Sequence, residues 1–214
     1  MNCGRVVSCG RVAVYVVTAC SVTAALSAQS RLESRVPAPV LAAVGPTIDS
    51  ARAAGLPTGP LEDKVLEGVT KQADAGRIAA AVRRLAGELA AAREAFGDRA
   101  TTRELVAGAG GLRAGLTRGD LVRLRAARPG QNTALALEVA TDLITQGVPS
   151  DTATRVVLKV LGAGASDADL EQLRMAVERD IAGGVPAAVA ASVRARVLSG
   201  SPATTIPITP RPQN

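Results

Sequence analysis

A triplet of glycine, an aliphatic residue and proline occurs three times in this chain, at residues 55–57, 147–149 and 184–186. Glycine after a helix readily takes the left-handed conformation that closes the last turn, and the aliphatic side chain can pack back on that turn. Proline then prevents the helix from continuing and favours the start of a new one. Each triplet therefore predicts a junction between two consecutive helices.

Between these junctions, apolar residues recur at every third or fourth position, which places them along one face of an α-helix. The longest series, in residues 77–96, is Ile78, Val82, Leu85, Leu89, Ala92 and Phe96. Shorter series are Leu61, Val65 and Val69; Leu135, Val139 and Leu143; Leu170, Leu173, Val177 and Ile181; and Val189, Val193 and Val197. No segment alternates apolar and polar residues for long enough to form a strand. The sequence predicts an all-α fold with an aliphatic core.

Hydroxyl and acidic residues three positions apart indicate where several helices begin. Thr101 precedes Glu104, Thr117 precedes Asp120 and Ser166 precedes Asp169, which is the spacing of a capping box. We expect three αα-hairpins at about 61–96, 102–128 and 150–183, with further helices near 133–146 and 186–199. Residues 117–127 partly align with 166–176, and residues 64–78 with 156–170, at unequal offsets. An irregular stack of αα-hairpins, similar to a helical-repeat array, is predicted, and common ancestry of the hairpins stays open.

Residues 1–28 have the order of segments found in a secretory signal peptide. Arg5 and Arg11 precede the apolar residues 12–26, and small residues follow. Cleavage after Ala28 is expected, with cleavage after Ala25 as the alternative. Either would direct the chain to the periplasm or cell envelope of a bacterium.

Two other interpretations of this segment stay open. Residues 17–20, Val-Thr-Ala-Cys, resemble the lipobox of bacterial lipoproteins, so Cys20 could become a lipidated N-terminus. The segment could also remain as an uncleaved anchor, although it is short for a membrane span. Membrane attachment is expected only through this segment or through a lipid on Cys20.

Proline divides the rest of the chain into three parts. Residues 29–60 contain Pro37, Pro39, Pro46, Pro57 and Pro60 and are predicted to be a tether with one short helix at Thr47–Ala54. Residues 61–200 are predicted to be the helical domain. Residues 201–214 contain four prolines without helical periodicity and are predicted to be a disordered tail.

The sequence offers few side chains for catalysis. It contains no histidine, and its cysteines, Cys3, Cys9 and Cys20, all lie in the predicted leader. Cleavage after that leader would exclude His- and Cys-based catalysis and the usual zinc sites. The glycine-rich run 108–115 lacks the lysine of a phosphate-binding loop and is interpreted as a broken or kinked helix. We predict no enzymatic activity, no catalytic residue, no cofactor and no metal.

One basic segment is a candidate binding site. Residues 99–128 hold seven arginines and two acids, a local charge of 7 − 2 = +5. Arg113, Arg118, Arg125 and Arg128 are the candidate anion-binding residues, because guanidinium groups bind phosphate and carboxylate in a fork geometry. The alternative is that these arginines form an ordinary solvated face.

These observations favour an exported, non-enzymatic helical protein that serves as an interaction or structural module in a bacterial cell envelope. Its partner would be a protein or an envelope polymer. The alternative function is a polyanion or membrane-surface binder that uses the arginines of residues 99–128. A nucleic-acid partner is not expected, because that segment has no aromatic side chain on which bases could stack.

Overall fold

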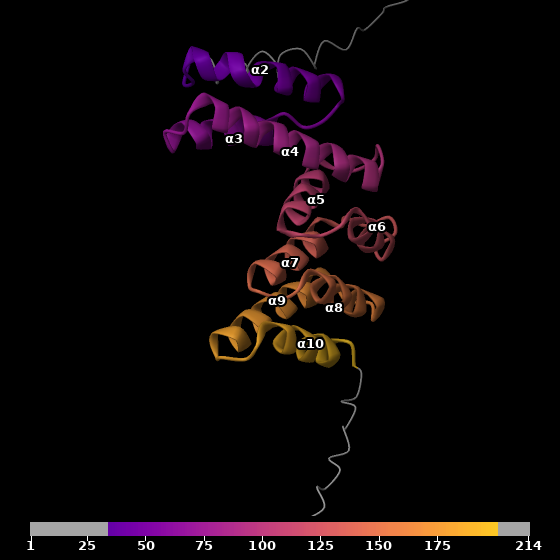
Figure 1. The fold of residues 1–214 in the computed structure, drawn as a ribbon. Helices are drawn as coiled ribbons and strands as arrows, with labels where there is room; N and C mark the ends of the chain where they lie inside the picture. Colours follow the sequence, from indigo (N-terminus) through magenta and orange to yellow (C-terminus); the bar gives the residue numbers. More distant parts are fainter. Residues whose placement is uncertain (1–33, 201–214) are drawn as a thin grey trace, which may run out of the picture.

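The computed structural model describes residues 34–200, and all regular structure in this part of the chain is helical (Figure 1). The helices are α2 (Ala38–Ala53), α3 (Gly59–Thr70), α4 (Ala75–Phe96), α5 (Thr102–Ala114), α6 (Arg118–Ala126), α7 (Ala134–Thr145), α8 (Ser150–Gly162), α9 (Asp167–Ala182) and α10 (Ala187–Leu198). The all-α prediction is therefore confirmed. The predicted signal segment 1–28 and tail 201–214 lie outside the described residues.

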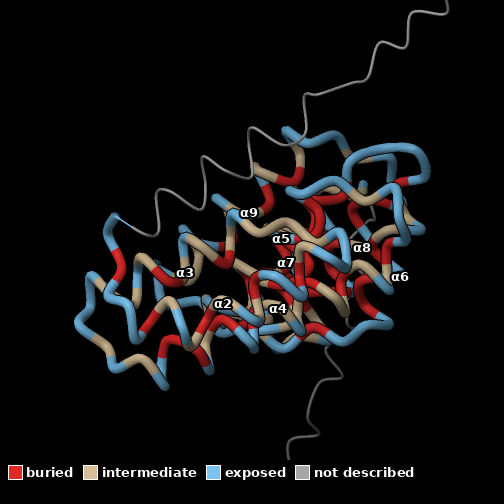
Figure 2. Tube along the Cα trace, turned by 90° about the horizontal axis from the view of Figure 1, so that it is seen from above, coloured by how far each residue is buried: buried red, intermediate tan, exposed pale blue. Residues whose placement is uncertain are grey.

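The apolar series read from the sequence become buried faces in most of these helices. All six residues of the α4 series are buried, and Val82 and Leu89 are fully inaccessible. Buried residues lie where neighbouring helices face each other, and exposed residues gather at the turns (Figure 2). The core consists almost entirely of alanine, valine and leucine, with Phe96 as its aromatic residue.

The helix boundaries follow the predicted signals. Thr101, Thr117 and Ser166 each form a capping box with the acid three residues later, which satisfies first-turn N–H groups that have no partner within the helix. Gly147 and Gly184 have φ angles of 93° and 90°. This left-handed conformation ends α7 and α9 before the proline that precedes the next helix.

The prediction of a tether with a short helix at 47–54 is wrong for residues 38–53. These residues form one helix, α2, with Pro46 inside it. An internal proline costs a helix about 3 kcal/mol. Burial of Val40, Val44 and Ile48 against the stack outweighs this cost, because each aliphatic side chain contributes about 1.5–3 kcal/mol.

The helices are stacked along one axis, from α2 at one end to α10 at the other (Figure 1). The even-numbered helices each pack on the next even-numbered helix, and α5, α7 and α9 form a second row in the same way. Helix α3 packs on α4, and close contacts between α4 and α5, α7 and α8, and α9 and α10 join the two rows.

The hairpin predicted at 150–183 is wrong. This segment consists of α8 and α9, which have little direct contact, because both pack on α7 and α10 instead. The partial alignment of 117–127 with 166–176 likewise matches α6 to α9, which lie in different rows. The sequence signals marked the ends of the helices but carried no information about which helices pair.

The prediction for α10 is also wrong. Its expected core series Val189, Val193 and Val197 is exposed, with 51%, 37% and 66% of each residue accessible. We call these three residues the valine stripe. The buried face of α10 consists of Ala190, Ala191 and Ala195, because the small side chains allow the helix to lie close against α8 and α9.

The glycine-rich run 108–115 is not a broken helix as predicted. Residues 108–114 continue α5 without interruption, and the helix ends at Gly115, which has a φ of 112°. Among residues 34–200, no helix combines the length and apolar character required to cross a membrane.

Candidate functional site

The four candidate anion-binding arginines each contact a carboxylate on another helix. The ion pairs are Arg113–Glu88, Arg118–Glu94, Arg125–Glu104 and Arg128–Asp167. Three of these partners belong to α4 and α5, and Asp167 belongs to α9. Each of the four guanidinium groups is therefore already paired with a carboxylate of its own.

Two further arginines of the basic segment also form ion pairs, Arg103 with a residue of another helix and Arg123 with a residue of its own helix. Arg103 forms a two-point contact with Glu138, and Arg123 contacts Asp120 at 2.5 Å. Among the described residues, only Arg99 of this segment has no ion-pair partner. Most of the local charge of +5 is thus balanced by nearby acids, so the segment is not a free cationic surface.

The buried acid Glu104 joins three parts of the stack. Its side chain is 2% exposed, accepts hydrogen bonds from the backbone N–H groups of Thr101 and Thr133 at 3.0 and 2.9 Å, and pairs with Arg125. Burial alone would raise the pKa of Glu104, but these hydrogen bonds and the Arg125 charge outweigh it and hold the pKa below its ordinary value. Glu104 is a structural anion.

Other carboxylates also have structural partners. Asp120 and Asp169 accept hydrogen bonds from the hydroxyl and backbone N–H groups of Thr117 and Ser166. The pKa of Asp169 lies below its ordinary value, because the hydrogen bonds from Ser166 stabilise the charged form. Within residues 34–200, no group of histidine, cysteine or acidic side chains is arranged to hold a metal ion.

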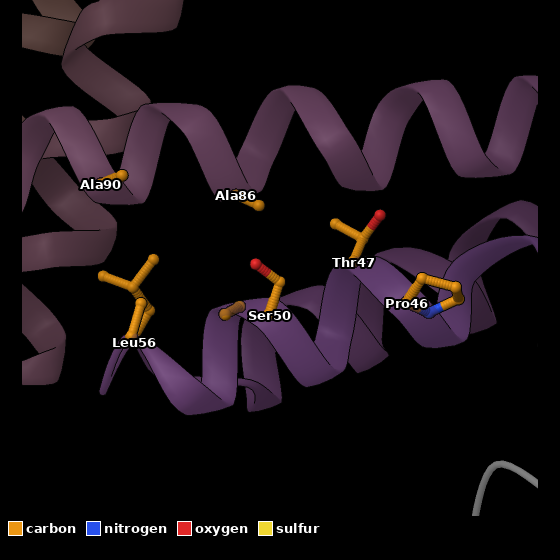
Figure 3. Close-up of a pocket in the computed structure, with 8 residues that line it drawn as sticks. Pro46, Thr47, Ser50, Leu56, Ala86 and Ala90 are labelled. Carbon is orange, nitrogen blue, oxygen red and sulfur yellow. The ribbon is translucent and has the colours of Figure 1, made fainter.

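A crevice between α2 and α4 also lacks reactive groups. It encloses about 390 Å³, and Figure 3 shows Pro46, Thr47 and Ser50 of α2 opposite Ala86 and Ala90 of α4. The small side chains of α4 leave this space between the two helices. Its only polar side chains are two hydroxyls, which provide neither charge nor an acid–base group.

A larger groove runs between α5 and α7 and encloses about 600 Å³. It is lined by Thr102, Arg103, Val106, Ala107 and Gly110 of α5 and by Glu138, Thr141 and Asp142 of α7. We call it the α5–α7 groove. Val106 is 41% exposed there, and the buried Ala107 and the half-buried Gly110 line the groove beside it. The groove therefore offers apolar surface that the fold itself leaves uncovered.

Charged side chains flank this apolar surface. The Arg103 guanidinium donates to both carboxylate oxygens of Glu138, at 3.0 and 2.8 Å, and so bridges α5 and α7. Partial burial raises the pKa of Asp142 above its ordinary value; the Arg174 guanidinium, 3.6 Å away, opposes this rise, and the charge of Glu138 adds to it. The groove thus combines an apolar surface with a polar rim, as protein-binding surfaces commonly do.

We did not predict this groove from the sequence. The sequence gives one indication of it, because Val106 is apolar but follows Leu105 directly and therefore lies outside the buried face of its helix. Glu138 and Thr141 carried no such signal, because their position beside α5 depends on how the helices pack.

Comparison of the chain with known protein families, with curated proteins and with solved structures found no match.

Proposed function

We propose that this chain is an exported, non-enzymatic interaction module of a bacterial cell envelope, built as an irregular, helical-repeat-like stack. In this proposal the α5–α7 groove receives an apolar side chain of a protein partner. The main observation that supports this proposal is the exposed Val106, which lies in the groove beside Ala107, Gly110 and the Arg103–Glu138 ion pair. Stacked helices commonly bind partners through the grooves between them.

The ion pairs described above favour this function over binding of a polyanion or a membrane surface. A polyanion would have to compete with Glu88, Glu94, Glu104 and Asp167 for the four candidate arginines. Such binding would also weaken steeply as salt concentration rises, because it depends on the release of counterions. An apolar groove predicts binding that is much less sensitive to salt.

The test is capture of envelope components by the immobilised chain at low and high salt. The variant is Val106→Asp, and the matched control is Val122→Asp, which places the same charge on an exposed valine of α6 outside the groove. We expect the wild type and Val122→Asp to retain the same protein at both salt concentrations and Val106→Asp to lose it. Retention that is unchanged by Val106→Asp but lost in high salt would support the polyanion alternative and overturn the groove.

Export requires its own measurement. Mass spectrometry of the N-terminus of the protein from its native cell would show a chain beginning at Gln29 or Leu26 after signal-peptide cleavage. A lipidated Cys20 would support the lipoprotein interpretation, and an intact Met1 would contradict cleavage.

A further inference from the structure

The charged side chains around the α5–α7 groove are mostly acidic, although the whole chain has a net charge of +6. Helix α9 packs on α7 and adds acids to those that line the groove. Partial burial raises the pKa of Asp142, and the charges of nearby acids, Glu171 and Glu178 of α9 among them, add to this rise. Four acids and two arginines give this surface a local charge of 2 − 4 = −2: Glu138, Asp142, Glu171, Glu178, Arg103 and Arg174. A negative surface favours a partner that carries positive charge.

Asp142 is the acid of the groove that has no hydrogen-bond donor. Arg103 donates to both oxygens of Glu138, and Arg174 donates to Glu171 from two nitrogens, at 2.9 and 2.6 Å. The Arg174 guanidinium lies 3.6 Å from the Asp142 carboxylate, and no side chain or backbone group of residues 34–200 donates a hydrogen bond to that carboxylate. Its side chain is 45% exposed, so a cation in the groove can reach it.

The same groove contains the exposed Val106. An occupant of this space of about 600 Å³ therefore meets an apolar side chain from α5 and a carboxylate without a hydrogen bond from α7. A second copy that used the same surface would bring two acidic surfaces together, because a two-fold interface places identical patches against each other. Such a contact between like charges is unfavourable.

We propose that the partner of the α5–α7 groove is a basic protein segment, in which an apolar side chain packs on Val106 and a neighbouring lysine or arginine pairs with Asp142. This inference rests on the proposed function, because it specifies the partner of the same groove. The cation would offset the mutual repulsion of Asp142 and the acids of α9. Charge complementarity contributes more to specificity and association rate than to affinity, so the apolar contact still holds the partner in high salt.

The test is a titration of the isotope-labelled full chain with blocked synthetic peptides, followed by the NMR shifts of its backbone amides. The probe is Gly-Lys-Leu-Lys-Gly. The control Gly-Glu-Leu-Glu-Gly replaces the cations by acids, and the control Gly-Lys-Ala-Lys-Gly shortens the apolar side chain. We expect the probe to shift the amides of Gly110 and Asp142 and to bind about threefold more tightly than either control.

Two variants locate the contacts of the probe. Asp142→Asn should weaken its binding about threefold, because the charge that pairs with lysine is removed. The matched control is Asp151→Asn, which removes the charge of an exposed acid of α8 outside the groove and should leave binding unchanged. Val106→Ser should weaken binding of both leucine-containing peptides, because it removes apolar surface from the groove.

The results that would overturn the proposal differ from one another. If Val106→Ser weakens binding of the probe but Asp142→Asn does not, the groove binds an apolar side chain and the basic partner is wrong. If Val106→Ser leaves both leucine-containing peptides unaffected, the proposed function of the groove fails together with this inference. If the groove amides shift with protein concentration when no peptide is present, a second copy of the chain occupies the groove instead.

Discussion

Gly108 of α5 lies against the aromatic ring of Phe96 of α4 so closely that a Cβ atom at position 108 would be 2.7 Å from the Cε2 atom of Phe96. The same Cβ would be 3.0 Å from the Cβ of Ala92. The absence of a side chain at position 108 therefore sets how near α5 can approach α4. Part of the glycine-rich run thus has a packing role within a continuous helix.

The first prediction compares two glycines of α5. Gly108→Ala should lower the free energy of unfolding by about 1–2 kcal/mol, because the cost of overpacking exceeds the gain in helix propensity. Gly110→Ala should raise it by about 0.5–1 kcal/mol, because a Cβ at position 110 would have no atom within 4 Å and only the propensity gain remains. Urea denaturation followed by circular dichroism measures both. Stabilisation by both substitutions would contradict the close approach of α5 to α4.

The second prediction concerns the buried acid Glu104. Glu104→Gln keeps the size of the side chain but removes the charge that faces Arg125, so we expect a loss of about 2 kcal/mol of stability. A double-mutant cycle with Arg125→Gln should give a coupling energy above about 0.5 kcal/mol. Glu94→Gln is the control, because its pair with Arg118 is exposed and should contribute less than about 1 kcal/mol. Equal losses at positions 94 and 104 would argue against the buried role of Glu104.

The third prediction separates two of the candidate anion-binding arginines. The side chain of Arg128 is 8% exposed and that of Arg118 is 63% exposed, although both are ion-paired. Arg128→Gln should cost about 2 kcal/mol, since it removes packed methylene groups together with the charge. Arg118→Gln should change stability by less than about 1 kcal/mol. Thermal melts of the two variants distinguish these outcomes, and a larger loss at position 118 would refute this ranking.

The fourth prediction concerns pH. Hydrogen bonds from Lys64 and Lys71 lower the pKa of Glu67 from its ordinary value of 4.5 to about 2. Because the pKa is lower in the folded chain, the contribution of Glu67 to stability is present above about pH 4.5 and is lost as the pH falls to about 2. The difference in melting temperature between the wild type and Glu67→Gln should therefore shrink over this range. It should also shrink in high salt. A constant difference would contradict the lowered pKa.

Features that depend on a few neighbouring residues could be predicted from the sequence. The capping boxes at Thr101, Thr117 and Ser166 and the turns at Gly147 and Gly184 were all predicted from local spacing. The buried face of α4 was predicted because a long series of apolar residues leaves one choice of face.

Features that depend on packing between helices could not be predicted in this way. The valines of α10 have the same spacing as a core series, but the alanines on the other face allow closer packing and are buried instead. Because Pro46 lies inside α2, we predicted a tether there, although the helical series Val40, Val44 and Ile48 was present in the sequence. The partners of the arginines and the α5–α7 groove depend on which helices become neighbours, and helix periodicity does not specify this.

Extensive contacts between the described helices join only helices that are one or two places apart in chain order. Each of these helices would therefore complete its buried face once the two helices after it have left the ribosome or a translocation channel. Such a chain can fold progressively as it emerges, without waiting for its last residues, and a low average sequence separation of contacts is associated with fast folding.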